Sequence, residues 1–247
     1  MGGVMTEAIL YDCKDGLARI TLNRPEARNA LNSAMCEALM AATRSARADG
    51  ARCVLVSAIG PVFCAGADLK ERQGMSDDAV RARRLKAFSA YDALERLPMP
   101  AIAVVEGAAV GSGVEIAAAC DFIIATPAAS FLTPEALWGT VGATQRLPRI
   151  IGKRLAKDLM FTGRALRAEE ARDAGLVSRV VPPEALDDII SDITTTILKS
   201  PPAAIALAKR CVDEGLERDP RGALATEILA IEESLAAAEW RKKMQDL

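Results

Sequence analysis

Two glutamates, Glu115 and Glu135, are the residues of this chain whose type and setting best suit proton transfer. The 247 residues include no histidine, which excludes Ser-His-Asp and Cys-His catalysis and histidine metal ligands. Proton transfer must therefore fall to carboxylates, Lys, Tyr or Cys. Glu135 follows Thr133-Pro134, a pair typical of a helix start with threonine as N-cap and proline at the first position. Either glutamate alone is more often a solvated surface residue, so its neighbours decide the interpretation.

Glu115 ends a segment that suits the stabilisation of negative charge. Residues 106–115 pass from a buried strand through a Gly-rich turn into an Ala-rich helix, whose first N–H groups attract developing negative charge. Residues 63–70 likewise follow a strand with small residues that permit close approach of the backbone to a ligand. The run from Gly111 also resembles a dinucleotide fingerprint, but Ile116 occupies the place of the third glycine. A purely structural turn is the alternative for this run taken alone.

Strands that alternate with helices must position these segments. The polar turn Lys14-Asp15-Gly16 predicts an opening hairpin. An Ala-, Met- and Leu-rich stretch with helical spacing predicts a helix over Ser33–Ala48, and short apolar runs predict strands buried on both faces. The predicted strands are Ile9–Asp12, Leu17–Leu22, Cys53–Val56, Ala101–Val105, Phe122–Ala125 and Leu176–Ser178. This alternation predicts an α/β domain.

The chain becomes purely helical in pattern beyond Pro182-Pro183, with interruptions at Ser200-Pro201-Pro202 and Asp219-Pro220. We therefore expect a core domain over residues 1–195 and a helical region over residues 196–247. An apolar, Ala-rich tail of this kind suits a subunit interface, although packing on its own core is the alternative.

Composition excludes several classes of function. The 31 Lys and Arg residues against 33 Asp and Glu give a net charge of −2, which offers no overall electrostatic reason to bind nucleic acid. The most apolar stretch, residues 101–120, is interrupted by Glu106 and Glu115, so no membrane span is expected. The six cysteines form no C-x-x-C pair and suit reduced thiols better than disulfides or a metal site. The N-terminus lacks the pattern of a secretory signal, and we expect a cytoplasmic protein.

Taken together, these segments resemble the crotonase (enoyl-CoA hydratase/isomerase) family over nearly the whole chain. Residues 63–71 and 106–121 are similar to its two oxyanion-hole segments, and residues 23–32 to its N-terminal CoA-binding loop. Residues 144–147 and 161–164 resemble its later signatures. The resemblance implies an α/β fold, a crotonase-like spiral of ββα repeats, with a C-terminal helical region that builds homotrimers and often hexamers made of two trimers.

The resemblance also implies roles for individual residues. The backbone N–H groups of Ala67 and Ser112 would hold the thioester oxygen as it becomes an enolate. Glu115 would deprotonate the attacking water, and Glu135 would supply a proton to Cα. No metal or redox cofactor is implied, because coenzyme A is part of the substrate. The implied CoA-binding residues are Arg24, Arg28, Ala30, Ala65, Ala67, Asp68, Leu69, Lys70 and Ser112. For the two arginines, a solvated loop position is the alternative.

The implied activity is reversible hydration of a trans-2-enoyl-CoA, as in fatty acid metabolism. A Δ3,Δ2-enoyl-CoA isomerase, which needs one base and no water, is an alternative. A non-catalytic acyl-CoA-binding relative is another, because only Val141–Ala143 stand where the family commonly has a longer Gly-rich loop. Residues 63–72 particularly resemble the methylglutaconyl-CoA hydratase branch, some members of which bind RNA. We interpret the basic run formed by Arg81, Arg83, Arg84 and Lys86 as the solvated face of a helix.

Overall fold

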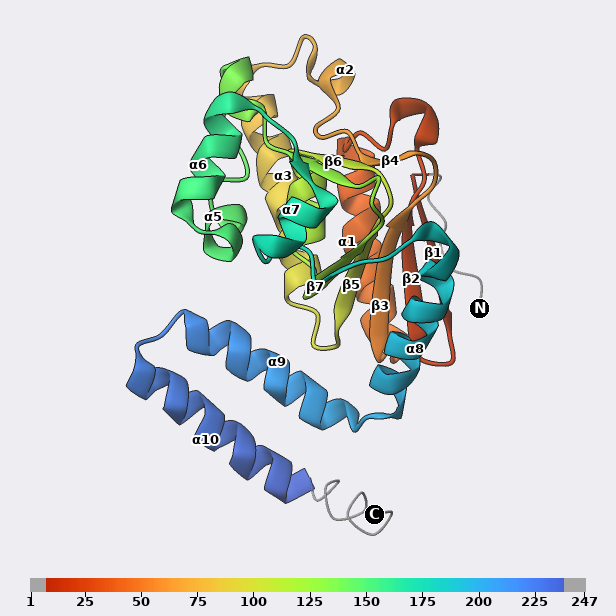
Figure 1. Cartoon of the computed structure of the whole chain (residues 1–247), viewed down its shortest axis with the longest axis vertical. Helices are drawn as coiled ribbons and strands as arrows, with labels where there is room; N and C mark the ends of the chain where they lie inside the picture. The colour runs from red at the N-terminus through yellow and green to blue at the C-terminus, as the bar shows by residue number, and fades with distance from the viewer. Residues whose placement is uncertain (1–7, 238–247) are drawn as a thin grey trace.

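The computed structural model describes residues 8–237 and contains two β-sheets surrounded by helices (Figure 1). The strands are β1 (Ile9–Lys14), β2 (Leu17–Leu22), β3 (Cys53–Ala58), β4 (Val62–Cys64), β5 (Ala101–Val105), β6 (Ala108–Val110), β7 (Phe122–Ala125), β8 (Ser130–Leu132), β9 (Leu166–Arg167) and β10 (Arg179–Val180). The α-helices are α1 (Ser33–Ala48), α2 (Leu69–Arg72), α3 (Asp77–Glu95), α4 (Ser112–Ala118), α5 (Arg146–Ile151), α6 (Lys153–Thr162), α7 (Ala168–Asp173), α8 (Leu186–Lys199), α9 (Pro202–Leu216) and α10 (Pro220–Ala237). Three short 3-10 helices are η1 (Pro25–Ala27), η2 (Glu135–Trp138) and η3 (Pro183–Ala185).

Consecutive strand pairs build the two sheets together. The larger sheet has the order β1-β2-β3-β5-β7-β10, and the smaller has the order β4-β6-β8-β9. The pairs β3-β4, β5-β6 and β7-β8 each give one strand to each sheet before the chain turns into helix. Within each sheet, the strands that these pairs contribute lie parallel to one another. This arrangement is the spiral of ββα repeats that the family resemblance predicted.

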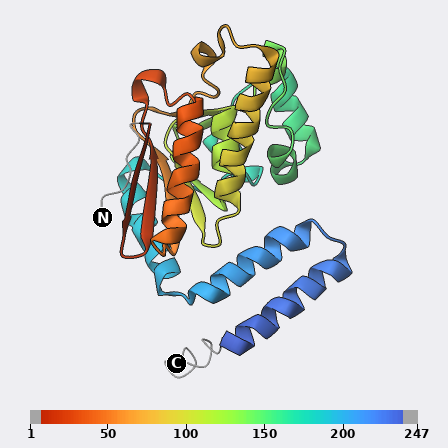
Figure 2. The same ribbon diagram turned by 180° about the vertical axis from the view of Figure 1, so that it is seen from behind.

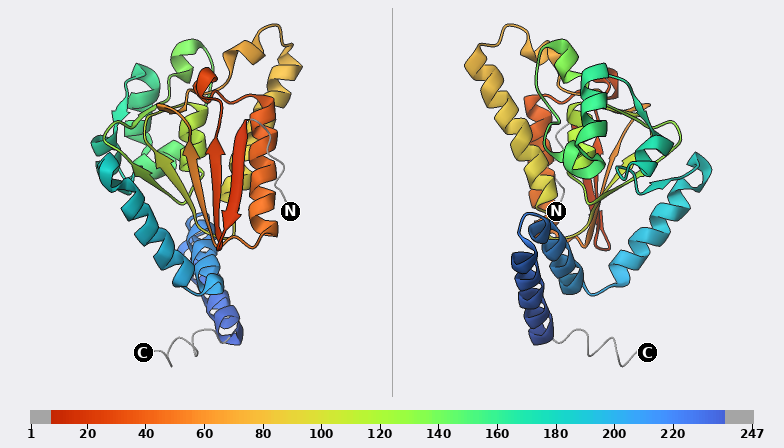
Figure 3. Two further views of the ribbon diagram at one scale, coloured as in Figure 1. Left: turned by 90° about the vertical axis from the view of Figure 1, so that its right-hand side faces the viewer. Right: turned by 60° about the vertical axis from the view of Figure 1, so that its left-hand side comes forward.

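Both faces of the larger sheet are covered, because its central strands are apolar on both sides. Val54 and Val56 of β3 belong to the main core, which also contains Leu39 of α1. Leu55, which points to the other face, packs in a second cluster with Ile193 of α8. Figure 2 shows α1 and α3 together on the first face, and the left view of Figure 3 shows α8 on the opposite side of the sheet. The larger sheet is thus a central layer between α1 and α3 on one face and α8 on the other.

Most of the predicted elements are confirmed, and one strand is wrong. The opening hairpin pairs Ile9 with Leu22, and α1 covers the predicted residues, with the Asn32 side chain accepting a hydrogen bond from the Met35 N–H at 2.8 Å. The strand predicted at Leu176–Ser178 is instead an irregular segment that leads into β10. Leu176 and Val177 are apolar because they are buried, not because they pair in a sheet. The six cysteines are free, as predicted.

The last two helices form a hairpin that stands below the body of the molecule in Figure 1. Lys209 of α9 connects it to the core through a 2.6 Å ion pair with Asp121, whose other oxygen accepts the Ala101 N–H at 2.6 Å. The division at residue 195 stays a prediction, and that position lies inside the continuous helix α8. Within residues 8–237, none of the helices combines the length and apolar character needed to cross a membrane.

Candidate active site

The two predicted oxyanion segments and Glu135 meet at one edge of the smaller sheet. β4, β6 and β8 are parallel neighbours, so the segments that follow them leave from the same edge. Ligand sites of parallel sheets form at such carboxyl ends. A pocket of about 710 Å³, its open mouth included, is lined there by Ala67, Ser112, Glu115 and Glu135. The structure thus brings together all four residues that were predicted to carry the chemistry.

Two backbone N–H groups are available at the pocket wall. In the described chain the N–H of Ala67 donates to no other backbone carbonyl, because its neighbours Gly66 and Asp68 make the hydrogen bonds to Leu31. Ser112 is the first residue of α4, where N–H groups have no partner within the helix. Both positions can therefore donate to a bound oxygen, and the α4 dipole favours negative charge there.

Glycine at position 113 allows the two donor segments to lie against each other. A Cβ atom built on Gly113 would stand 2.5 Å from the carbonyl oxygen of Cys64 and 2.9 Å from its Cβ. Any side chain would therefore push the start of α4 away from the end of β4. The Gly-rich turn recognised in the sequence thus has a packing role at Gly113 as well as a place at the pocket.

Glu115 lies in the first turns of α4 and is only 7% exposed. Its Oε2 accepts a 2.8 Å hydrogen bond from Nη1 of Arg146, whose Nη2 donates to Glu95 at 2.5 Å. The guanidinium of Arg146 also stands 5.8 Å from the centre of the Tyr91 ring, within the range of a cation–π contact. Arg146 therefore fixes one oxygen of Glu115 and leaves the other without a hydrogen bond from a described residue.

Glu135 is held by close contacts with backbone instead of by a cation. Its Oε2 is buried and has no hydrogen-bond partner among the described residues. Cβ atoms built on Gly111 and Gly142 would lie 2.5 and 2.9 Å from its Oε1, so these glycines form a tight cradle. Burial is the main effect and raises the pKa of Glu135, and the negative charge of Glu115 raises this pKa further. A hydrogen bond from its own backbone and the positive charge of Arg84 lower the pKa but do not cancel the rise. The pocket thus favours the protonated form of this carboxyl.

The predicted helix start before Glu135 is wrong in its details. Glu135 begins a short 3-10 helix, with Pro134 at the cap position and no capping side chain. Thr133 is 1% exposed, and its Oγ1 is buried without a partner instead of capping the turn. Backbone packing after β8, not an N-cap, therefore positions the carboxylate.

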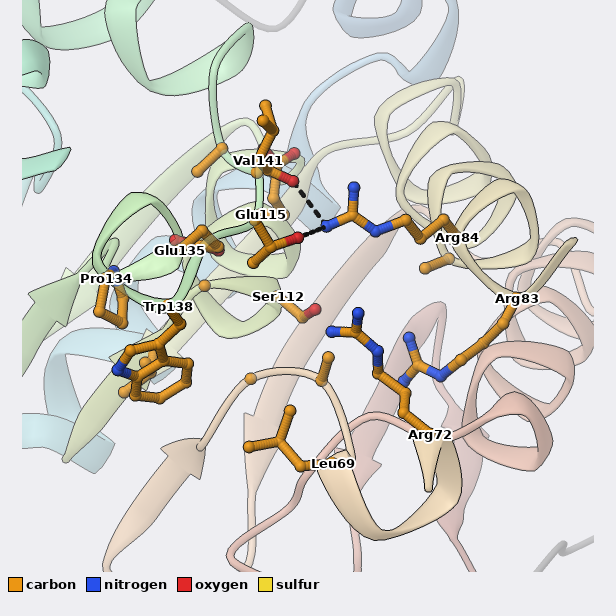
Figure 4. A pocket seen from close by; sticks show the side chains of 18 of the residues that line it. Leu69, Arg72, Arg83, Arg84, Ser112, Glu115, Pro134, Glu135, Trp138 and Val141 are labelled. Carbon is orange, nitrogen blue, oxygen red and sulfur yellow. Dashed lines mark hydrogen bonds between the residues drawn. The ribbon is translucent and has the colours of Figure 1, made fainter. Parts of the chain in front are cut away.

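The short loop after Glu135 is tied to α3. Nη2 of Arg84 donates to Oγ1 of Thr140 at 2.6 Å and to the carbonyl oxygen of Val141 at 2.7 Å. Ala143 closes the loop with φ = 54°, a left-handed conformation that is strained for alanine. Figure 4 shows Arg84 reaching from α3 to the Val141 side of the pocket. The loop thus forms a wall of the pocket.

This finding corrects the interpretation of the basic run as a solvated face. Arg83 is 5% exposed and is paired with Glu71 at 2.6 Å, and it also donates to the Leu31 carbonyl. Arg83 falls on the same helical stripe as Ala87, Ala90 and Leu94. That stripe was the signal in the sequence that this arginine is buried.

The residues predicted to bind CoA lie along two adjacent segments. Residues 28–31 run beside residues 65–68, joined by hydrogen bonds such as Ala65 N–H to Arg28 C=O at 3.0 Å. Ala30 and Ala65 are half-buried. Arg28, Leu69 and Lys70 are exposed.

Arg24, by contrast, is engaged within the chain. Its guanidinium donates to Oδ2 of Asp68 at 3.1 Å and to the Ala30 carbonyl at 2.5 Å. Although burial opposes it, the hydrogen bond from Arg24 lowers the pKa of Asp68, which also caps α2 by accepting the N–H groups of residues 70 and 71. Arg24 thus joins the two segments, and a diphosphate would have to share it.

Arg146 is the main functional candidate that the sequence reasoning left without a role. It was recognised as part of the Thr144-to-Leu147 signature, but its contact with Glu115 spans 31 positions and is visible only in the fold. Arg72, Arg84 and Tyr91 line the pocket itself, and the sequence reasoning did not assign them to the site either.

Known proteins resemble this chain along most of its length. The sequence profile of the enoyl-CoA hydratase/isomerase family matches residues 12–246. Putative enoyl-CoA hydratase/isomerase YngF of Bacillus subtilis (strain 168) is 38% identical over 247 residues, which cover 98% of this chain and 95% of that protein. Probable enoyl-CoA hydratase echA8 of Mycobacterium leprae (strain TN) is 40% identical over 219 residues, covering 85% of this chain and 83% of that protein.

The same likeness holds between structures. A crystal structure of enoyl-CoA hydratase from Bacillus anthracis superimposes with a TM-score of 0.92 at 35% identity, covering 96% of this chain and 95% of that chain. The enoyl-CoA hydratase of Mycobacterium smegmatis gives a TM-score of 0.89 at 34% identity, covering 95% of this chain and 96% of that chain.

Proposed function

Because this chain belongs to the enoyl-CoA hydratase/isomerase (crotonase) family, we propose that it is an enoyl-CoA hydratase, which adds water reversibly to a trans-2-enoyl-CoA thioester. The observation that carries the proposal is the meeting of two differently held carboxylates in one pocket. Glu115 is paired with Arg146, whereas Glu135 has a raised pKa and a buried oxygen without a partner. Both lie beside the backbone donors of Ala67 and Ser112.

The proposed mechanism begins at the thioester carbonyl. Hydrogen bonds from the N–H groups of Ala67 and Ser112 withdraw electrons from the conjugated double bond and make Cβ electrophilic. Glu115 accepts a proton from water as the water oxygen bonds to Cβ, and the electron pair of the double bond moves into the enolate. Each oxyanion donor typically contributes a factor of roughly 10²–10³.

Glu135 completes the addition. Its protonated carboxyl gives a proton to Cα as the enolate collapses back to the thioester, and dehydration follows the same steps in reverse. Burial suits this role because it holds the proton on Glu135 at a higher pH than in water. The reaction as proposed needs no metal or redox cofactor, since the thioester supplies the electron sink.

The substrate's CoA portion would bind along the paired segments 28–31 and 65–70. Arg28 and Lys70 supply exposed positive charge there, which suits phosphate groups. The backbone around Ala30, Ala65, Asp68 and Leu69 would contact the pantetheine and adenine parts. These assignments transfer to this chain the CoA-binding positions that the family resemblance implies.

A second candidate reaction is isomerisation of a 3-enoyl-CoA to the 2-enoyl-CoA. It is favoured by one observation, the occupation of Oε2 of Glu115 by Arg146, which leaves Glu135 as the carboxylate with an unpartnered buried oxygen. An isomerase needs only one such group to move a proton between carbons. Chromatography of the products separates the two activities. An isomerase forms the 2-enoyl-CoA from a 3-enoyl-CoA, whereas a hydratase acts only when the 2-enoyl-CoA itself is supplied.

Loss of the absorbance of crotonyl-CoA tests hydration. We expect wild-type turnover, and a fall of about 10²–10⁴-fold for each of Glu115→Gln and Glu135→Gln. Glu184→Gln, at an exposed carboxylate outside the pocket, is the matched control and should match the wild type. Wild-type rates no higher than those of the two variants would refute the proposal. If crotonyl-CoA still binds in that case, the chain is a non-catalytic acyl-CoA-binding protein.

We also propose that the protein assembles as a homotrimer or as a hexamer of two trimers. The α9–α10 hairpin carries large apolar side chains that are at least half exposed, among them Leu216, Ile228 and Leu229. Large apolar side chains exposed together on one hairpin suit an interface. Light scattering coupled to size-exclusion chromatography measures the mass, and a monomer at micromolar concentration would contradict the assembly. The cytoplasmic location stays a prediction.

A further inference from the structure

We propose that Arg84 is a positioning residue for the carboxyl of Glu135: it holds the loop that follows this glutamate against α3, and so fixes the place and the electrostatic surroundings of the carboxyl. The inference deepens the proposed function, on which it rests for the reaction in which Glu135 gives a proton to Cα. Its structural basis is the set of contacts that join Arg84, residues 139–143 and Glu135.

The loop formed by residues 139–143 lies directly against Glu135. The Thr140 N–H donates to the backbone carbonyl of Glu135 at 2.9 Å. A Cβ atom built on Gly142 would lie 2.9 Å from Oε1 of Glu135 and 3.0 Å from its Cγ, so Gly142 packs closely on the side chain itself. A displacement of this loop would therefore displace the carboxyl.

Arg84 is the side chain that joins this loop to α3. Its Nη2 donates to Oγ1 of Thr140 at 2.6 Å and to the carbonyl oxygen of Val141 at 2.7 Å. Figure 4 shows the Arg84 side chain directed from α3 toward Val141. Among residues 8–237, no other side chain outside the loop donates a hydrogen bond to it. Ala143 keeps a left-handed φ of 54°, a conformation that persists only where surrounding contacts enforce it. The loop geometry is therefore imposed by contacts, and Arg84 supplies two of them.

The charge of Arg84 acts on the same carboxyl. Arg84 is half-buried, and the two groups that accept its hydrogen bonds, a hydroxyl and a carbonyl, are uncharged. Burial raises the pKa of Glu135 and the charge of Glu115 adds to the rise, whereas a backbone hydrogen bond and the positive charge of Arg84 oppose it. The arginine that holds the loop therefore also favours the ionised form of the carboxyl.

The other charged residues around the site have different partners. Arg83 is paired with Glu71 at 2.6 Å, and Arg146 with Glu115 and Glu95. Arg72 of α2 lines the pocket but forms no hydrogen bond with the loop in the described chain. The charged side chains of α6, which packs beside η2, are exposed, namely Lys153, Arg154, Lys157 and Asp158. Both the contact with the loop and the effect on Glu135 thus belong to Arg84.

Replacing Arg84 with methionine tests both parts of the inference. We expect kcat for crotonyl-CoA to fall about 10–100-fold, because the carboxyl loses its fixed position, while KM changes little. The alkaline limb of the pH profile of kcat/KM should move to higher pH, because loss of the cation raises the pKa of Glu135 further. NMR of protein labelled with ¹³C at the glutamate carboxyls follows the same titration without turnover, and the loss of one signal in Glu135→Gln assigns it.

Three further variants separate the contact with the loop from the charge. Thr140→Val removes one acceptor of Arg84 and keeps the charge, so kcat should fall about 2–10-fold, the effect of one hydrogen bond, with the titration of Glu135 unchanged. Arg84→Lys should keep the wild-type titration and part of kcat. Arg81→Met, at an exposed arginine of α3 that is paired with Asp78, is the matched control and should change neither quantity. Circular dichroism checks that each variant is folded.

Two outcomes would overturn the inference. An unchanged titration of Glu135 in folded Arg84→Met shows that the arginine does not act on this carboxyl. A raised KM with an unchanged kcat assigns Arg84 to substrate binding instead. A wild type that hydrates no enoyl-CoA would refute the proposed function, and a raised NMR titration of Glu135 in Arg84→Met would in that case still support the role of Arg84.

Discussion

Replacing Arg146 with methionine should impair both stability and turnover, because this arginine holds Glu115 in place. The Arg146 side chain is 20% exposed; it donates to Glu115, whose side chain is 9% exposed, and to Glu95, whose side chain is 47% exposed. Methionine replaces the unbranched apolar stem of the arginine side chain and carries a sulfur that can contact the Tyr91 ring. The substitution therefore removes the charge and the two ion pairs while preserving most of the packing.

The expected loss of stability comes mainly from the buried pair. A hydrogen bond between charged groups that are shielded from water contributes about 1.5–3 kcal/mol. The pair with Glu95 is half exposed and, after screening by solvent, adds at most about 1 kcal/mol. We expect the free energy of unfolding to fall by about 2–3 kcal/mol in Arg146→Met, and by less than 1 kcal/mol in Glu95→Gln.

The expected loss of activity follows from the position of Glu115. A displacement of a catalytic group by about 1 Å can cost a factor of 10², so kcat for crotonyl-CoA should fall about 10²-fold in Arg146→Met. Arg146→Lys keeps a charge but loses the fork, and we expect an intermediate rate. KM should change little, because Arg146 is not among the residues that line the pocket.

Urea unfolding and the hydration assay measure both effects on the same preparations. The matched control is Arg149→Met, on the same helix, whose 3.7 Å pair with Glu217 joins two exposed side chains. It should leave both quantities near their wild-type values. If Arg146→Met lost stability but kept kcat within about threefold, the reasoning that Glu115 acts in the position set by Arg146 would be wrong.

Three other predictions follow from contacts at the site and below it. Hydration requires the protonated form of Glu135, whose pKa is raised by burial, so kcat/KM should decline as the pH rises through that raised pKa; a rate that stays constant to alkaline pH would contradict the acid role. Gly142→Ala places a Cβ 2.9 Å from Oε1 of Glu135 and should lower kcat at least tenfold and stability by about 1–3 kcal/mol, as urea unfolding can check. Lys209→Met leaves Asp121 without its cation and should lower the unfolding free energy by about 1–2 kcal/mol; an unchanged denaturation midpoint would show that this ion pair does not hold α9 to the core.

The elements that the sequence predicted well are those determined by local pattern. The helix over Ser33–Ala48 has an Asn32 cap and a continuous apolar stripe, and the strand Ala101–Val105 is apolar on both faces. Leu176–Ser178 has the same apolar character, but it packs against the core without pairing. An apolar run therefore reports burial, and only the neighbouring strands decide whether it becomes part of a sheet.

The candidate site was predictable where the backbone creates it and unpredictable where distant side chains meet. The segments that hold Ala67, Ser112, Glu115 and Glu135 were recognised because turns and small residues mark the ends of strands, and the family resemblance then assigned the roles of these four residues. The partner of Glu115, by contrast, depends on how α5 packs beside α4, which no local pattern encodes. The contact of Arg84 with the loop after Glu135 is equally invisible in the sequence, since it joins positions 56 and 57 residues apart.

The order in which β4, β6 and β8 occur along the chain has a consequence for folding during synthesis. A ribosome adds roughly 5–20 residues per second, so several seconds separate the appearance of β4 from that of β6, its only neighbour in the described sheet. During that interval β4 has an unpaired edge on both sides, a state that invites pairing between nascent chains. We expect the yield of correctly folded protein to depend on the speed of translation between residues 64 and 108, a stretch that is made entirely before either glutamate.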